Sequence, residues 1–281
     1  MITLSDLRKV FGSIVAVDNL TLEIRPGEVF GLLGPNGAGK TTTVNMAIGL
    51  LKPDAGRVVF DGQGSPEDAA VRRRIGVAPQ EMAIYDELSG EENVSFFGRL
   101  QGLTGRELAE RVAWSLEFVG LSDRRRHRAK TYSGGMQRRL NLAIAIVHDP
   151  ALLLLDEPTV GVDPQSRNAI FERIEALQER GRTIVYTTHY MEEAQRLCDR
   201  VCIIDRGKVL ALDTVDALIA AHGGKSVVRA RTSEGETRIE TDDPVAELKR
   251  LQEAGGLEHF RVDRPDLEQV FLNLTGRHLR D

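Results

Sequence analysis

The residues with the clearest chemical meaning form one glycine-rich segment. This segment reads Gly34-Pro35-Asn36-Gly37-Ala38-Gly39-Lys40-Thr41. It fits the pattern G-x-x-x-x-G-K-[ST], in which glycines let backbone N–H groups converge on phosphate oxygens. Lys40 would place its positive charge on the β- and γ-phosphates, and the Thr41 hydroxyl would be a ligand of Mg²⁺. The segment therefore predicts a binding site for a nucleoside triphosphate with Mg²⁺.

Two acidic residues follow a run of four leucines at residues 152–155. A continuous apolar run of this length indicates a buried strand, which we expect beside the strand that enters the phosphate loop. Asp156, at the end of that strand, would reach Mg²⁺ through water. Glu157, one residue further on, could polarise the water that attacks the γ-phosphate. Without the phosphate loop, the same two residues would indicate only a surface acid pair.

A second glycine pair lies at Tyr132-Ser133-Gly134-Gly135-Met136-Gln137, before an apolar segment rich in arginine. Serine and glycine ahead of a helix again predict a helix N-terminus that can bind an anion. One triphosphate rarely needs two such sites on one chain. We therefore expect two chains, each of which offers this segment to the nucleotide held by the other.

These segments, in this order, resemble the nucleotide-binding domain of ABC transporters over about residues 2–220. The part that resembles the family signature consists of Ser133, Gly134 and Gly135 with Gln137 and Arg138. Tyr132 stands where Leu is commonest. The resemblance implies an ATPase that binds ATP and Mg²⁺ through residues 34–42. It also implies a dimer with ATP at the interface and a separate transmembrane permease subunit as the partner.

Further residues gain a role only through this resemblance. Gln80 falls at the Q-loop glutamine, which senses Mg²⁺ and couples to the membrane partner, and His189 matches the switch histidine. Phe11 matches the aromatic that stacks on adenine, and residues 161–163 resemble the D-loop. Taken singly, Gln80 would be an ordinary loop residue, His189 a surface histidine and Phe11 a core side chain.

The implied site residues fall into three sets. The catalytic set is Glu157, His189, Lys40 and Gln80. The Mg²⁺ set is Thr41, Gln80 and Asp156. The set that contacts ATP is Phe11, Gly34, Pro35, Asn36, Gly37, Ala38, Gly39, Lys40, Thr41, Thr42, Ser133, Gly134, Gly135 and Gln137.

The scaffold that must hold these motifs is predicted to alternate strands with helices. Apolar runs predict strands at 29–33, 152–155 and 183–188 and a hairpin at 201–212, and helical spacing predicts helices at 41–51 and 165–181. This alternation implies a mostly parallel sheet. Apolar and polar residues nearly alternate at 10–24, which predicts β structure, and residues 58–62 predict a hairpin edge. Helical spacing at 88–119 predicts an inserted helical subdomain over about 81–132.

The expected fold is therefore an α/β P-loop NTPase core with a mostly parallel sheet, an N-terminal antiparallel β subdomain and the helical insertion. A small C-terminal α+β appendage follows, so that residues 1–221 form the ATP-binding domain and 222–281 an accessory domain. Within the appendage we expect strands at 226–230, 237–241 and 257–262 and helices at 244–254 and 265–274.

The end of the chain carries a second resemblance. Residues 263–277 resemble the tail of bacterial drug-resistance exporter ATPases of the daunorubicin-resistance type, the ABC-2 group. Its apolar positions, Leu267, Val270, Phe271 and Leu274, form one helical face by themselves. A helix that only packs against the appendage and a helix with a dedicated coupling role both fit this pattern.

Composition limits the possible partners. The net charge of −5 excludes a global basic field, so no nucleic-acid partner is expected. Apolar runs fall far short of the roughly 18 residues of a membrane span, and the N-terminus lacks a signal-peptide pattern. We therefore expect a cytoplasmic chain, held on the inner face of the cell membrane by its permease. Cys198 and Cys202 are expected to be buried, reduced thiols.

Two other classes of protein share the phosphate loop. A soluble ABC ATPase without a transport role is the main alternative to a transporter subunit, although the C-terminal appendage argues against the cluster-assembly type. A small-molecule kinase is the second alternative. Such a kinase would have no use for Ser133-Gly134-Gly135 or for His189 in this order.

Overall fold

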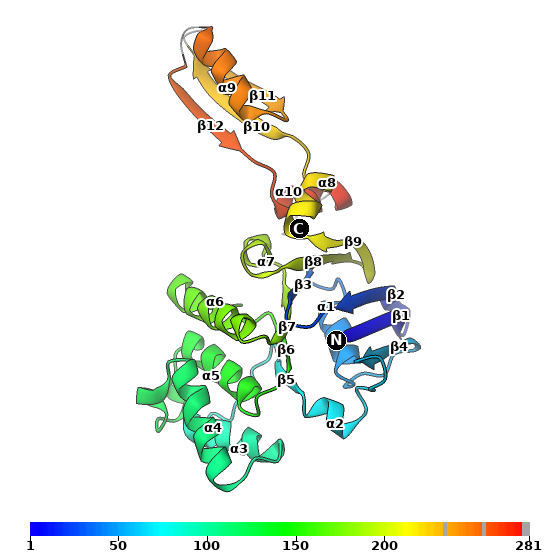
Figure 1. Cartoon of the computed structure of the whole chain (residues 1–281), viewed down its shortest axis with the longest axis vertical. Helices are drawn as coiled ribbons and strands as arrows, with labels where there is room; N and C mark the ends of the chain where they lie inside the picture. Colours follow the sequence, from blue (N-terminus) through cyan, green and yellow to red (C-terminus); the bar gives the residue numbers. More distant parts are fainter. Residues whose placement is uncertain (233–234, 255–256, 277–281) are drawn as a thin grey trace. The chain divides into compact units, whose positions relative to one another are not determined.

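The structure is a computed structural model that describes residues 1–232, 235–254 and 257–276 (Figure 1). It divides into two compact units, Met1–Leu212 and Asp213–Asp281. The division falls before helix α8 (Val215–His222), whereas the sequence placed a boundary at the end of that helix. The assignment of two functional domains stays a prediction.

A six-stranded sheet forms the centre of the first unit, with strand order β5-β6-β7-β3-β8-β9. The strands are β3 (Val29–Leu33), β5 (Ile75–Ala78), β6 (Leu152–Asp156), β7 (Thr183–Thr188), β8 (Arg200–Asp205) and β9 (Lys208–Thr214). The five strands from β5 to β8 pair in parallel, and every residue of β3, β6 and β7 is buried. The predicted parallel core is thus confirmed. Strand β5 was not predicted, because four residues give too short a pattern.

An antiparallel sheet with order β2-β1-β4 covers the N-terminal part of the unit. Strand β1 (Ile2–Phe11) forms a hairpin with β2 (Ile14–Ile24), and β4 (Ala55–Phe60) pairs with β1 at the edge. The prediction of β structure from residue 10 onward therefore started too late. At Asp6 the backbone has φ 52°, and the pairing shifts between Leu4 and Leu7. This irregularity hides the alternation, although both leucines are buried. The predicted hairpin edge at 58–62 agrees with this arrangement, because β4 is the edge strand and Phe60 pairs with Gly64 in an antiparallel bridge across residues 61–63.

The predicted helical region at about 81–132 contains helices α3 (Gly90–Leu100) and α4 (Gly105–Phe118), and helix α5 (Gly134–Ile146) follows it. Leu108, Val112 and Leu116 are buried on one face of α4, as their spacing predicts. Helix α5 contacts α3, α4 and strand β5. Although it begins beyond the predicted boundary near residue 132, it joins the helical region to the sheet.

The other helices of the first unit are α1 (Lys40–Ala47), α2 (Ala69–Arg72), α6 (Pro164–Glu179) and α7 (Met191–Leu197), with 3₁₀ turns at Ser122–Arg124 and Ala129–Thr131. Helix α1 ends earlier than the predicted residue 51, because the backbone reaches φ 74° at Gly49. In Figure 1, α6 and α5 lie on one side of the central strands and α1 on the other. Among the described residues, no helix is long and apolar enough to span a bilayer.

The second unit contains a three-stranded antiparallel sheet, ordered β11-β10-β12. Its elements are β10 (Ser226–Thr232), β11 (Gly235–Thr241), α9 (Pro244–Glu253), β12 (His259–Asp263) and α10 (Leu267–Thr275), besides α8. Leu267, Val270 and Phe271 are buried, and α10 contacts α8. The predicted apolar helical face is thus a packing surface. Arg277, the last residue of the tail resemblance, lies outside the described residues, and a coupling role for the tail stays a prediction.

Candidate functional site

The glycine-rich loop connects β3 to α1 and lies against backbone from two other strands. A side chain at Gly39, which caps α1 with φ 103°, would collide with the carbonyl of Ala16. A side chain at Gly34 would collide with the carbonyl of Ile204. These two positions admit only glycine, so the loop keeps a shape in which backbone N–H groups at the start of α1 face outward.

A cavity of about 670 Å³ lies over this loop. Its lining comprises Phe11, Ile14, Val15, Ala16, Asn36, Gly37, Gly39, Lys40, Thr41, Thr42, Gln80, Glu157, Val160, His189 and Tyr190. Phe11, Ile14 and Val15 come from the tip of the β1–β2 hairpin and are 49%, 68% and 39% exposed. The cavity therefore has an apolar rim and a floor of charged and amide groups, which suits a ligand with an aromatic base and a phosphate chain.

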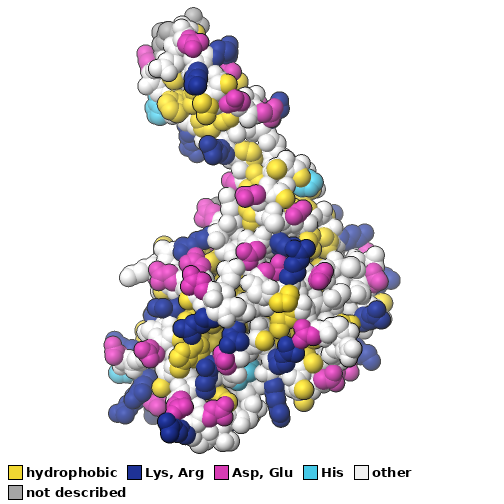
Figure 2. Space-filling view, viewed as in Figure 1, with side chains coloured by type: hydrophobic (Ala, Val, Ile, Leu, Met, Phe, Trp, Pro, Cys, Tyr) yellow, Lys and Arg dark blue, Asp and Glu magenta, His cyan; other side chains and the backbone are white. Residues whose placement is uncertain are grey.

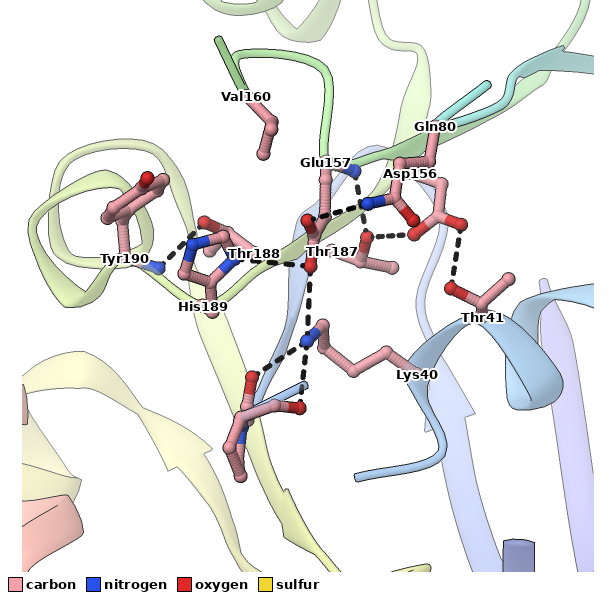
Figure 3. A network of polar contacts seen from close by, with 12 residues as sticks. Lys40, Thr41, Gln80, Asp156, Glu157, Val160, Thr187, Thr188, His189 and Tyr190 are labelled. Carbon is pink, nitrogen blue, oxygen red and sulfur yellow. Dashed lines mark hydrogen bonds and ion pairs between the residues drawn. The ribbon is translucent and has the colours of Figure 1, made fainter. Parts of the chain in front are cut away.

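Lys40 lies at the floor of this cavity, and its side chain is 5% exposed. Its ammonium donates to the carbonyls of Gly34 at 2.8 Å and Pro35 at 3.1 Å. The same nitrogen lies 3.2 Å from Glu157 Oε1, as Figure 3 shows. The charge predicted to bind phosphate is thus held in the loop by two carbonyls and one carboxylate.

Glu157 is the centre of the polar network in Figure 3. Its Oε1 also lies 3.2 Å from His189 Nδ1, and its Oε2 accepts a hydrogen bond from Gln80 Nε2 at 3.2 Å. Its backbone has φ 46°, an unfavourable region for glutamate, and its N–H donates to the hydroxyl of Thr187 at 3.0 Å. The four predicted catalytic residues therefore meet at one carboxylate, although they come from four separate segments.

The two other predicted metal ligands lie beside this network. Thr41 Oγ1 donates to Asp156 Oδ2 at 3.0 Å, and Thr187 donates to Asp156 Oδ1. Asp156 ends β6 and is 4% exposed. Hydroxyl, carboxylate and amide oxygens are hard ligands that fit Mg²⁺. Among the described residues, no group of three or more His, Cys, Asp and Glu side chains is placed to hold a metal ion, so a metal here would take its remaining ligands from phosphate or water.

The signature-like residues lie apart from this cavity. Ser133 caps α5, and its hydroxyl accepts from the backbone N–H of Met136 at 3.3 Å. Ser133 and Gly134 are exposed, whereas Gly135 packs against Ser166 so closely that a side chain would collide. Of the described residues that line the cavity, none comes from 132–137. The structure thus brings the other predicted residues together and leaves this segment on its own surface.

Tyr132, at the position where the resemblance leads us to expect leucine, fits within the segment. It is buried, and its hydroxyl donates to the carbonyl of Arg124 at 2.8 Å. A side chain at Gly90, the first residue of α3, would collide with that hydroxyl. The extra polar atom of tyrosine therefore has a partner and a space inside the helical region.

Two supporting residues make contacts that the sequence did not predict. The hydroxyl of Thr187 joins Asp156 to the backbone of Glu157. The guanidinium of Arg138, on α5, donates to the carbonyl of Gln80 at 2.6 Å and to that of Val160 at 3.3 Å. Arg138 therefore connects helix α5 with two segments that line the cavity, those of Gln80 and Val160. Burial lowers the pKa of Arg138, but an arginine stays charged at neutral pH. Contacts between residues so far apart in sequence leave no local pattern.

Comparison with known proteins places the chain in a family. The family model described as ABC transporter matches residues 17–160. The linearmycin resistance ATP-binding protein LnrL of Bacillus subtilis is 40% identical, with 100% of each chain covered. The Nod factor export ATP-binding protein I of Cupriavidus metallidurans is 43% identical and covers 100% of this chain and 99% of its own.

Solved structures give the same result. The ATP-binding subunit of an ABC transporter aligns with a TM-score of 0.71 and 29% identity, covering 79% of this chain and 93% of its own. The dimeric cassette MJ0796, solved in a post-hydrolysis state with ADP and Pi, aligns with a TM-score of 0.70 and 28% identity, covering 76% and 98%. The family match, the full-length relatives and this likeness support a subunit that dimerises and works with a membrane partner. The chain therefore belongs to the ABC transporter family, as an ATP-binding and ATP-hydrolysing subunit of a transporter.

Proposed function

We propose that two copies of this chain bind two ATP molecules at their interface and use the hydrolysis to drive a separate membrane permease. The observation that carries this proposal is the meeting of Lys40, Gln80 and His189 at the carboxylate of Glu157. A buried carboxylate at the end of a strand, with a cation and two polar side chains around it, is placed to act on water at a phosphate.

ATP would contact both the apolar rim and the polar floor of the cavity. Phe11 is half exposed at the rim, where its ring face is available for stacking on adenine. Residues 34–42 would hold the phosphates with backbone N–H groups and the start of α1. Lys40 would share its ammonium between the loop carbonyls and the β- and γ-phosphates, which keeps the charge fixed at the reacting group.

Hydrolysis would then depend on Glu157. Its carboxylate would accept a proton from the attacking water, while Gln80 and His189 hold that carboxylate and the γ-phosphate in line. The left-handed backbone at Glu157 directs the side chain away from the line of β6 into the cavity. Thr41, Asp156 and Gln80 are the residues that would hold Mg²⁺. When bound, the ion would neutralise charge on the phosphate oxygens.

The exposed Ser133 and Gly134 would complete the site of the partner copy. Both lie outside the cavity of their own chain, at a helix N-terminus suited to an anion. ATP would hold the two copies together, and loss of the γ-phosphate contact would let them separate.

The permease would bind at the helical region. Tyr85 and Phe96 expose 50% and 39% of their surface there, with ring centroids 5.1 Å apart, and Leu100 is 67% exposed. An apolar cluster of this kind beside the segment that carries Gln80 suits a short helix from a membrane subunit. The names of the relatives, linearmycin resistance and Nod factor export, favour export and a location at the inner face of the cell membrane.

The proposal is tested by measuring phosphate release against subunit concentration. If two chains build each site, the specific rate rises with concentration toward a plateau, and EDTA abolishes it. A specific rate that does not change with concentration contradicts the two-chain site. Co-purification of the tagged subunit with a membrane protein whose presence alters the rate tests the transport role.

A further inference from the structure

A buried carboxylate lies behind the catalytic network without a role in the proposal above. Glu193, on α7, is 2% exposed and accepts hydrogen bonds from three hydroxyl groups. Its Oε1 accepts from Thr159 at 2.7 Å, and its Oε2 accepts from Tyr186 and Thr188 at 2.8 Å each. Both oxygens are therefore satisfied, as a buried carboxylate requires.

The three hydroxyls come from segments that matter for catalysis. Thr159 lies two residues after Glu157, in the stretch that leads to residues 161–163, and is 1% exposed. Thr188 directly precedes His189, and its hydroxyl also accepts the backbone N–H of Tyr190 at 2.9 Å. Glu193 thus connects the segment after Glu157 to both sides of His189.

The surroundings of Glu193 fix its contacts further. Arg167 Nε, on α6 beyond residues 161–163, lies 3.9 Å from Glu193 Oε1. The same guanidinium lies 5.6 Å from the ring of Tyr190, whose centroid is 4.1 Å from that of His189. Burial, followed by the nearby Glu193 charge, raises the pKa of Tyr186 well above its usual range, so its hydroxyl stays protonated and can donate.

A purely structural role does not need this arrangement. Buried charge is costly, and apolar groups of similar shape often give equal or greater stability. Here a charged group joins two loops that hold catalytic residues and contacts an arginine from the helix between them. The hydrogen bonds from the three hydroxyls to the buried carboxylate keep these groups at fixed separations.

We propose that Glu193 is a positioning residue for hydrolysis, which links the segment after Glu157 to the loop of His189 so that the two move together. This inference rests on the proposed function. It adds a physical link between the segment after Glu157 and the loop of His189. Displacement of residues 159–163 by the partner copy would pass through Thr159, Glu193 and Thr188 to His189. Loss of any link lowers kcat and leaves ATP binding unchanged.

The test compares substitutions that remove one hydroxyl with others that keep it. Thr188→Val and Thr159→Val preserve the branched shape, whereas Thr188→Ser and Thr159→Ser keep the hydrogen bond. A displacement of His189 by about 1 Å predicts a kcat loss on the order of 10- to 100-fold in each Val variant. Each Ser variant keeps kcat within about threefold of the unaltered chain, and KM for ATP stays within about twofold throughout.

A double variant separates a shared route from two independent defects. Because both hydroxyls act through Glu193, Thr159→Val combined with Thr188→Val loses no more kcat than the worse single variant. Additive losses, or a loss in KM instead of kcat, overturn the proposal. Glu193→Ala should match the double variant. If the Glu193→Ala variant does not fold, the comparison of the Val and Ser variants at Thr159 and Thr188 still tests the proposal.

Two measurements distinguish this inference from the proposed function. The unaltered chain must hydrolyse ATP and Glu157→Gln must not, or the proposed function itself fails. If both conditions hold and Thr188→Val keeps full kcat, only the role of Glu193 is refuted. Thermal unfolding of every variant shows that kcat is compared between folded proteins.

Discussion

The ammonium of Lys40 lies 3.2 Å from the carboxylate of Glu157, and each side chain is only 5% exposed. The predicted phosphate-binding charge and the predicted general base therefore form a buried ion pair. In such a pair, each group depends on the other, because removing one leaves an uncompensated buried charge. Changes at either position should act on stability as well as on activity.

Lys40→Ala should abolish tight ATP binding. Among the described residues that line the cavity, Lys40 carries the one ammonium, and the variant loses it. Glu157 then has only His189 and Gln80 as side-chain partners. We expect the free energy of unfolding to fall by about 3 kcal/mol. Isothermal titration calorimetry and urea unfolding measure the two effects. Lys52→Ala, at an exposed lysine, is the control, and unchanged ATP affinity in Lys40→Ala would refute the assigned role.

Glu157→Gln should stop turnover and keep ATP binding. The amide cannot accept the proton of the attacking water, but its shape still fits between Gln80 and His189. ATP then stays intact between the two copies, and gel filtration with ATP and Mg²⁺ should show a trapped dimer. Glu192→Gln, at an exposed neighbour of Glu193, should hydrolyse normally. Phosphate release from Glu157→Gln at the normal rate would contradict its assignment.

Ser133→Arg should block hydrolysis while the isolated chain still binds ATP. Residue 133 is exposed and lies outside the cavity of its own chain, so a large side chain obstructs only a site on the partner. Ser122→Arg places the same side chain at an exposed position of the helical region and should hydrolyse normally. Weaker ATP binding by the Ser133→Arg monomer, or retained hydrolysis, would show that the site is not shared.

The two thiols should resist modification in the folded chain. Burial raises the pKa of Cys202 to about 12 and the pKa of Cys198 further above its usual range. Because both values lie far above pH 8, almost no thiolate exists there, and only the thiolate is reactive. Ellman's reagent should react with both thiols after unfolding in guanidinium and with neither before. Rapid reaction of the folded chain would show that the region around α7 opens.

Local patterns predicted the parts of the site that are contiguous in sequence. Residues 34–41 and 152–157 carry their own signals, and the strands that hold them follow from apolar runs. Gln80 and His189 needed the resemblance, because a single loop residue has no pattern. The hydrogen bonds of Glu193 to Thr159, 34 residues away, and of Thr187 to Asp156, 31 residues away, depend on how strands align. Sequence spacing cannot show that alignment.

The elements that were missed have equally specific causes. Residues 2–9 of β1 were not predicted, because the irregularity at Asp6 breaks the alternation of buried residues. Helix α7 has only seven residues, too few for a clear helical period. Yet α7 carries Glu193, so an element with a weak sequence signal supports the loop of His189.

The contact between Tyr132 and Gly90 has a consequence for how this chain can diverge. Because the tyrosine hydroxyl fills the space where a side chain at position 90 would lie, the two positions can change only in a particular order. A lineage must first exchange Tyr132 for a shorter residue such as leucine before a larger residue can follow at position 90. Relatives with tyrosine at the first position should therefore have glycine at the second, whereas those with leucine should be free to vary there.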